Sequence, residues 1–324
     1  MLKRCFLMAV TLSLFLLSGC AGLLPERLGA LAQEQEGLHS PVAGEENADI
    51  YQAELYFRFL DEPYLAAESR TLIVQKDESF EKALVRALIS GPSAASSELR
   101  RLFSEDVTVE STVAQDKLLF VTLSANVTDP LGDEPARWRE DVYWQKEVPL
   151  RRQLAMQSLA ATLIENCGYE SIQILLDKRA DANGSMRLPM SYYQVNEAGL
   201  APVLRWDDQY LLTPQKAADV LLKSYQQKDW ERVMRYVAVA DGAPPPNQTT
   251  AGMLMDQWLT LIEYQLGEAV LSQRGGNGIV ACGATVARSV GDTQQLQAYP
   301  LRLIRENSIW KISWSELEGL LNRW

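Results

Sequence analysis

The sequence predicts an α+β protein in which two folded units follow one another along 324 residues. Three observations predict this class. Stretches in which every second residue is apolar indicate strands, stretches with apolar residues three and four positions apart indicate helices, and turns rich in glycine and proline separate them. The expected order of elements is β-β-α-β-β-α-β in the first unit and α-α-α-β-β-β-β in the second.

The first 19 residues have the features of an export signal. Lys3 and Arg4 precede an apolar run over residues 5–17, which is shorter than the roughly 20 residues of a membrane-spanning helix. Ser18 and Gly19 are small enough for cleavage between Gly19 and Cys20. An ordinary secretory signal with a chance cysteine, or an uncleaved anchor, is the alternative.

Residues 17–20, with the sequence Leu-Ser-Gly-Cys, resemble the lipobox of bacterial lipoprotein signals. The resemblance implies a diacylglyceryl group on the sulfur of Cys20 and a further acyl chain, such as palmitate, on its amine. Because stable anchoring takes two acyl chains, this group would hold the protein at the extracytoplasmic face of the cell membrane. Residues 20–50 would then form a flexible tether, which contains His39, the only histidine of the chain.

Charge and cysteine content exclude several classes of protein. The chain has 31 basic and 42 acidic residues, and removal of Lys3 and Arg4 with the signal leaves 29 basic residues against 42 acidic ones. Such a balance disfavours nucleic acid as a partner. After processing only Cys167 and Cys282 remain free, one in each unit, and two separate buried thiols are expected rather than a bridge between the units.

The first unit is expected over residues 51–180. Its helices show apolar residues at helical spacing, and the first has Asp77 or Ser79 as its cap and Gly91-Pro92 as its stop. Its strands show alternation, with a hairpin turn at residues 115–117. In chain order the expected elements are a strand with Leu55, Phe57 and Phe59, a strand at 71–75, a helix at 80–88, strands at 107–113 and 119–123, a helix at 154–163 and a strand at 172–176.

Three segments of this unit resemble the GerMN domain of the spore germination protein M type. They are residues 55–57 (LYF), residues 83–92 (ALVRALISGP) and residues 159–165 (LAATLIE), which lead into the strand at Ile172. The resemblance implies a protein of the cell envelope with a role in sporulation or germination. Two segments depart from the family pattern, namely the turn at 177–184 and the long loop at 128–147.

That loop carries Trp138, Tyr143 and Trp144 among many charged residues. Large aromatic side chains on a charged loop are typical of a partner-binding surface, and these three residues are candidate binding residues. The alternative is that they only pin the loop to the sheet.

The second unit is expected over residues 211–324, after a linker or extended edge segment at 181–210. Thr213-Pro214 predicts the start of a helix, Asp229 caps a second helix, and residues 251–266 are expected to form a third. Four strands are then expected, at 269–273, 279–287, 295–305 and 309–314.

This second pattern resembles the nuclear-transport-factor-2-like (NTF2-like) or cystatin-like domains appended to many bacterial lipoproteins. The resemblance rests on Thr213-Pro214, on Lys228-Asp229-Trp230, and on residues 300–304 and 310–312. It implies a concave pocket between helix and curved sheet. The residues that either line or fill that pocket are Trp258, Tyr264, Tyr299 and Trp314.

The residue inventory argues against an enzyme. With His39 in the expected tether, no Ser-His-Asp or Cys-His arrangement and no histidine-based metal site can be assembled on a folded frame, and no P-loop or dinucleotide fingerprint occurs. We therefore expect no catalytic residue, no cofactor and no metal, and a protein that binds an envelope protein or a cell-wall component.

Two alternatives remain. One is a carrier that binds a small ligand or wall fragment in the C-terminal pocket, which an open pocket would favour. The other is a wall hydrolase based on two carboxylates, which a converging pair in a cleft would favour.

Overall fold

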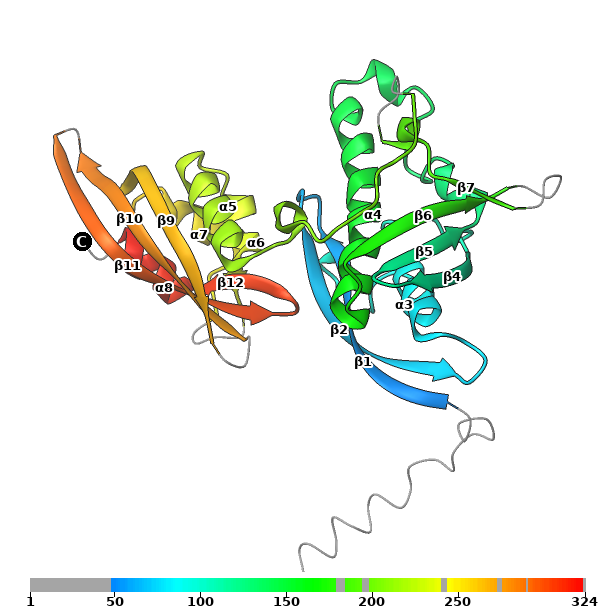
Figure 1. Ribbon diagram of the computed structural model, residues 1–324. Coiled ribbons are helices and arrows are strands. Elements are labelled where there is room, and N and C mark those ends of the chain that lie inside the picture. Colours follow the sequence, from blue (N-terminus) through cyan, green and yellow to red (C-terminus); the bar gives the residue numbers. More distant parts are fainter. Residues whose placement is uncertain are drawn as a thin grey trace, which may run out of the picture. The chain divides into compact units, whose positions relative to one another are not determined.

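The computed structural model describes residues 48–178, 184–193, 198–239, 244–272, 276–289 and 291–322 (Figure 1). Residues from Asp49 onward form one compact unit. Residues 1–47 lie outside the described residues. They include the expected signal at 1–19, the expected cleavage site at Gly19 and Cys20, and most of the expected tether with His39.

Among the described helices, none combines the length and the apolar character needed to cross a membrane.

The first part of the chain follows the expected order of elements, with two short strands added. It has a three-stranded sheet in the order β2-β1-β3 and a four-stranded sheet in the order β4-β5-β6-β7. The elements are β1 (Ala48–Phe59), β2 (Leu65–Gln75), α3 (Phe80–Ile89), β3 (Leu99–Arg100), β4 (Val109–Gln115), β5 (Leu118–Leu123), α4 (Trp144–Cys167), β6 (Ser171–Asp177) and β7 (Ser185–Arg187).

The alternation of β1 places its apolar residues in the core. Leu55, Phe57 and Phe59 are all buried, as predicted. Strand β3 pairs with β1 only at Arg58 and Phe59. The backbone groups that precede Arg58 on the same edge of β1 therefore need other hydrogen-bond partners.

Helix α4 supplies those partners from a polar stripe at four-residue spacing. Ser158 and Thr162 hydrogen-bond the carbonyl and amide of Tyr56, while the Asn166 side chain pairs with the amide and carbonyl of Glu54. Ser158 and Thr162 are completely buried, which explains why two hydroxyl residues occupy the inner face of this helix.

The four-stranded sheet combines both pairing directions. β4 and β5 form the expected hairpin, and β5 then pairs in parallel with β6, with Leu119 opposite Ile172 and Val121 opposite Ile174. These four side chains are buried in the same core as the apolar faces of α3 and α4. Val113 of β4, an edge strand of this sheet, is 58% exposed, although alternation with Val109 would place it on the buried face.

Helix α3 begins and ends where the sequence predicts. The Ser79 hydroxyl accepts a hydrogen bond from the amide of Lys82, so Ser79 is the N-cap. Gly91 follows the helix with φ of +90°, a conformation that favours glycine, and Pro92 comes next.

Helix α4 is longer than predicted. It begins at Trp144, so residues 144–147 belong to the helix and not to the loop, and it contains Pro149. The loop before it has two short 3₁₀ helices, Ala125–Thr128 and Trp138–Glu140. Helical periodicity was visible only from Leu154 onward because charged and polar residues dominate the first turns.

The described part of the segment expected as a linker packs closely against the four-stranded sheet. Leu188, Ala201 and Leu204 are buried, and Leu204 exchanges two backbone hydrogen bonds with Ile172 of β6. Two 3₁₀ turns, Met190–Tyr192 and Asp208–Tyr210, interrupt this segment.

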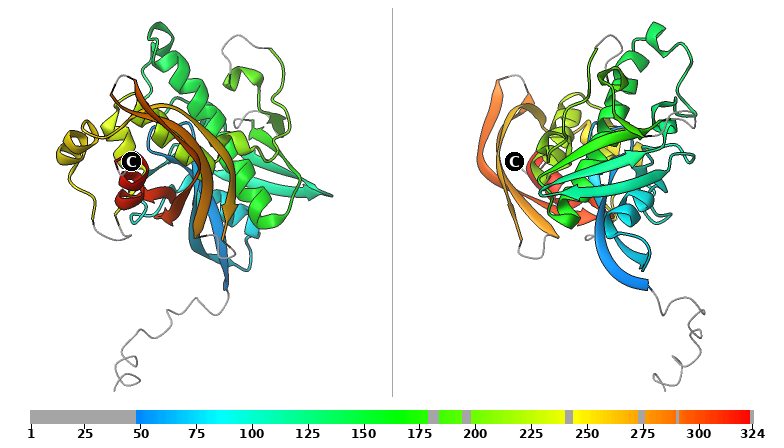
Figure 2. Two further views of the ribbon diagram at one scale, coloured as in Figure 1. Left: turned by 90° about the vertical axis from the view of Figure 1, so that its left-hand side faces the viewer. Right: turned by 45° about the vertical axis from the view of Figure 1, so that its right-hand side comes forward.

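The second part of the chain builds a curved five-stranded sheet in the order β8-β12-β11-β10-β9. Helices α5 and α8 lie on the same side of this sheet (Figure 2). The elements are α5 (Pro214–Gln226), α6 (Trp230–Arg235), β8 (Val237–Ala238), α7 (Gln248–Met255), β9 (Thr260–Leu271), β10 (Asn277–Ser289), β11 (Asp292–Glu306), β12 (Ile309–Ser313) and α8 (Trp314–Leu321).

The first two helices start at the predicted caps. Thr213 accepts a hydrogen bond from the amide of Lys216, with Pro214 as the first helical residue, and Asp229 accepts one from the amide of Arg232.

The prediction of a helix over residues 251–266 is wrong for the second half of that range. α7 ends at Met255, and residues from Thr260 onward form strand β9. A β-bulge lies between the pairs Glu263–Thr285 and Leu261–Val286. The extra residue leaves Leu261 and Tyr264 three positions apart on the inner face, which is the spacing that otherwise indicates a helix.

The C-terminal helix α8 is absent from the predicted order, in which Trp314 ended a strand. Ser313 caps this helix by accepting a hydrogen bond from the amide of Glu316. The Ser-x-x-Glu sequence followed by Leu317 and Leu320 is a helix-start signal that could have revealed it.

The space between helix and sheet in this part is filled. A cavity of only ≈ 10 Å³ remains there, enclosed by apolar side chains that include Leu221, Leu301 and Ile312. The four predicted aromatic residues do not line this cavity. Trp258 packs on Trp314, with 5.0 Å between the ring centroids. The Tyr264 hydroxyl donates to Asp219, and Tyr299 lies beside α8. A closed, apolar cavity counts against a ligand carrier that uses this pocket.

Cys167 and Cys282, the two cysteines among the described residues, are free thiols. Cys282 is buried, whereas Cys167 is only half-buried. Burial raises the pKa of Cys282 to about 11 and, together with the negative charge of Glu81, the pKa of Cys167 to about 12. Neither thiol therefore has a thiolate form at neutral pH.

Candidate functional site: an arginine-rich cleft

The structure separates the three aromatic residues predicted from the loop. Trp138 is buried with the Arg139 and Arg152 guanidinium groups near its ring, so it pins the loop. Trp144 is half-buried, and its ring lies 5.3 Å from that of Tyr143, which is 57% exposed. Of the three, Tyr143 is the one available to a partner, and its binding role stays a prediction.

Tyr143 lies at the edge of a cleft of ≈ 680 Å³. Five arginines and four acidic residues line this cleft together with a few apolar side chains. The charged residues are Arg58, Arg100, Arg101, Arg151, Arg235, Asp61, Glu105, Asp133 and Glu147.

A buried ion pair forms the floor of this arginine-rich cleft. Arg58 of β1 and Glu147 of α4 are 3% and 6% exposed, and two nitrogens of the guanidinium contact both carboxylate oxygens. The same guanidinium donates to the backbone carbonyls of Asp61 and Glu62. Arg58 therefore ties helix α4 to the turn between β1 and β2.

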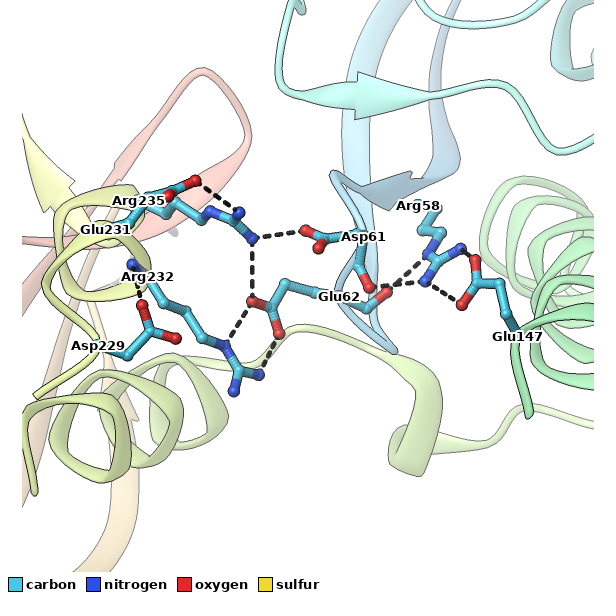
Figure 3. A network of polar contacts seen from close by, with 8 residues as sticks. All are labelled: Arg58, Asp61, Glu62, Glu147, Asp229, Glu231, Arg232 and Arg235. Atoms are coloured by element: carbon cyan, nitrogen blue, oxygen red, sulfur yellow. Dashed lines mark hydrogen bonds and ion pairs between the residues drawn. The ribbon is translucent and has the colours of Figure 1, made fainter. Parts of the chain in front are cut away.

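A second group of ion pairs starts from that turn (Figure 3). Glu62 is 3% exposed and accepts from two nitrogens of Arg232 in α6, at 2.7 and 2.5 Å. Arg235 of the same helix bonds Asp61 at 2.5 Å and approaches Glu62 at 3.7 Å. The hydrogen bonds that Arg232 donates to Glu62 raise the pKa of Arg232 above its ordinary value, although burial acts in the opposite direction.

Most charges of the cleft are already neutralised within the chain. Besides those pairs, Arg151 bonds Asp133 at 2.8 Å and Arg101 bonds Glu105 at 2.5 Å. Arg100 differs. It is exposed and donates only to the carbonyls of Ser97 and Leu99, with no ion pair to any residue that the structure describes. The cleft thus offers an outside group one guanidinium and one exposed aromatic ring.

The sequence alone did not reveal this cleft. Arg58, Arg100 and Arg151 are far apart in the chain and follow no motif, and Arg58 occupies a position whose alternation predicts an exposed side chain. Among the described residues, no group of three or more His, Cys, Asp or Glu side chains could hold a metal ion.

Residues 54–180 match the model of the Germane family, whose description is sporulation and spore germination. This part of the chain is similar to the Germane family. The match runs from the second half of β1 through β6. It includes four of the five arginines of the cleft, while Arg235 lies outside it.

Solved structures of GerMN domains are similar to part of this chain. The first GerMN domain of the sporulation protein GerM from Bacillus subtilis is 17% identical over 48% of this chain and 97% of its own, with a TM-score of 0.30. The tandem GerMN domains of the same protein are 16% identical, with a TM-score of 0.29. The match to the tandem covers 47% of this chain and 48%, or about half, of the tandem structure.

A candidate lipoprotein from Clostridium perfringens is 17% identical over 52% of this chain and 95% of its own, with a TM-score of 0.27. No curated protein matches this chain. The family match ends at residue 180 and does not reach the C-terminal part of the chain, so the NTF2-like assignment stays a prediction.

Proposed function

We propose that this GerMN-domain protein is anchored by a lipid on Cys20 at the extracytoplasmic face of the cell membrane. There it binds an envelope protein through the arginine-rich cleft, as a non-catalytic module of sporulation or germination. The Germane match supports the process, and the Leu-Ser-Gly-Cys sequence supports the anchor.

One observation carries the binding role, namely the position of Arg100 and Tyr143 on the same cleft. Tyrosine and arginine are enriched among the residues that contribute most to protein interfaces. A partner that presents a carboxylate to Arg100 and an apolar side chain to Tyr143 would fill the cleft without disturbing the other arginines, since those already hold carboxylates.

The arrangement of the carboxylates favours binding over glycoside hydrolysis. A glycosidase needs one carboxyl group that stays protonated as the acid. Here Asp61, Glu105, Asp133 and Glu147 each contact a guanidinium group of the chain, so none of the four carboxyl groups of the cleft is left unpaired to act on a substrate.

A photo-cross-linking amino acid placed at position 143 tests this proposal in the native envelope. We expect one envelope protein to be captured, because the position 143 side chain faces the partner. The matched control is position 51, where Tyr51 is also exposed (39%) but belongs to β1 and does not line the cleft. Capture from both positions alike, or from neither, would contradict the proposed site.

The anchor has its own test. Replacing Cys20→Ser removes the sulfur that would carry the diacylglyceryl group, and about 0.8 kcal/mol is lost for each methylene no longer buried in the membrane. We expect the variant to leave the membrane fraction, as measured by fractionation and immunoblotting. Cys167→Ser is the control and should stay with the membrane. Retention of the Cys20 variant would show that something other than this lipid holds the protein.

A further inference from the structure

A second cleft, of ≈ 270 Å³, lies between helix α4 and the segment that follows β7. Its size is close to the lower end of the roughly 300–1,000 Å³ found for small-molecule sites. The residues that line it are Gln153, Gln157, Met190, Tyr193, Pro202, Val203, Leu204, Arg205, Trp206 and Asp207. None of them lines the arginine-rich cleft.

Tyr193 brings an unsatisfied hydroxyl group to this second cleft. The residue is only 7% exposed, and its buried hydroxyl has no hydrogen-bond partner among the residues that the structure describes. Burial of an unpaired hydroxyl is unfavourable, so such groups are rare unless a ligand or water satisfies them. Burial also raises the pKa of Tyr193, which keeps the hydroxyl protonated and able to donate.

Two glutamines on α4 add further unpaired groups. Gln153 and Gln157 are four positions apart and thus share one face of the helix. Gln157 is 8% exposed, yet neither amide hydrogen-bonds any residue that the structure describes. Each amide presents a donor and an acceptor side by side.

The opposite wall of the cleft is held firmly in place. The Trp206 ring packs edge-on against Tyr56 at 5.8 Å, and its indole nitrogen donates to Asp208 at 2.8 Å. The backbone of Leu204 is hydrogen-bonded to β6, and Arg152 bonds the carbonyl of Tyr192 at 3.1 Å. These contacts hold Trp206 and Leu204 in place, which lowers the entropic cost of binding at this wall.

The lining groups select for an uncharged, amide-bearing ring. Arg205 and Asp207 supply one charge of each sign, so the cleft has no net preference for an ion. Trp206 offers an aromatic surface to the C–H face of a sugar ring, the glutamine amides and the Tyr193 hydroxyl fit an acetamido group, and Met190, Pro202 and Val203 fit its methyl group.

We propose that this second cleft binds an N-acetylated sugar residue of a glycan, with Tyr193, Gln153 and Gln157 on the acetamido group and Trp206 on the ring. The site is separate from the proposed protein-binding cleft. A lipid-anchored protein with both sites would hold its protein partner beside an N-acetylated glycan.

Calorimetric titration of the full chain in detergent with chitotriose, the β-1,4-linked trimer of N-acetylglucosamine, tests the proposal. We expect binding of chitotriose and at least tenfold weaker binding of cellotriose, which has the same linkage and no acetamido groups. Equal binding of the two sugars, or no heat with chitotriose at millimolar concentration, would overturn the proposal. Neither result bears on cross-linking from position 143.

Tyr193→Phe gives the sharpest variant, because it removes only the unpaired oxygen. We expect chitotriose to bind about 2- to 10-fold more weakly, as for loss of one hydrogen bond, with no loss of thermal stability. The double variant Gln153→Ala, Gln157→Ala should bind more weakly still. Tyr236→Phe is the matched control, since Tyr236 also has a buried, unpaired hydroxyl but lies outside the cleft. Unchanged affinity in both cleft variants would overturn the assignment.

Discussion

Replacement of Glu147 by alanine is expected to lower the free energy of unfolding by about 3–5 kcal/mol, the cost of removing one partner of a buried ion pair. Arg58 is 3% exposed, and its guanidinium would keep the two backbone carbonyls but lose both carboxylate contacts. Arg151 would lose its 2.6 Å bond to the same carboxylate. Urea unfolding followed by circular dichroism measures the change.

Glu140→Ala is the matched control for that variant. Its side chain is 70% exposed and lies 3.8 Å from Arg137, so its removal should cost less than about 1 kcal/mol. The double variant Arg58→Met, Glu147→Leu should recover much of the loss, because no unpaired charge remains buried. A Glu147 variant as stable as the Glu140 control would show that the pair does not hold the cleft floor together.

Glu62→Ala is expected to have the second largest effect. Glu62 is 3% exposed and holds both α6 arginines, but Arg232 has a side chain that is 30% exposed and can turn to water. The loss should therefore be smaller than for Glu147, about 2 kcal/mol. Since Glu62 belongs to the first part of the chain and α6 to the second, we also expect a broader thermal transition as the two parts unfold less cooperatively.

Scanning calorimetry measures both the midpoint and the breadth of that transition. Asp61→Ala is the matched control, because Asp61 is the neighbouring acid, also bonds Arg235 and is 65% exposed. It should change the free energy of unfolding by less than about 1 kcal/mol and leave the breadth unchanged. If Glu62→Ala and Asp61→Ala behave alike, burial of Glu62 does not set its contribution.

Local signals in the sequence were sufficient for much of the fold. The alternation of Leu55, Phe57 and Phe59, the caps at Ser79, Thr213 and Asp229, and the Gly91-Pro92 stop all act through neighbouring residues. The expectation failed where a distant contact decides the structure. The bulge in β9 exists because β10 pairs with it, and nothing within residues 260–266 distinguishes its spacing from that of a helix.

The candidate sites were harder to predict for the same reason. The aromatic loop was recognisable, and Tyr143 does lie on a cleft, but Arg100 and Glu147 reach the same place only through the folded sheet and helix. Tyr193 and Trp206 lie in a segment that looked like a linker because its glycines and prolines hide two short 3₁₀ turns. The aromatic residues of this segment were the one feature of the sequence that could have indicated that it packs against the fold.

The most direct test of the binding role compares cross-linking from position 143 in two charge variants. Arg100→Glu should abolish capture of the envelope partner, because a carboxylate on the partner would then meet a like charge. Arg137→Glu changes the same charge on an 83% exposed side chain away from the cleft and should leave capture intact. Equal capture in both variants would contradict the account, since Arg100 would then play no part in holding the partner.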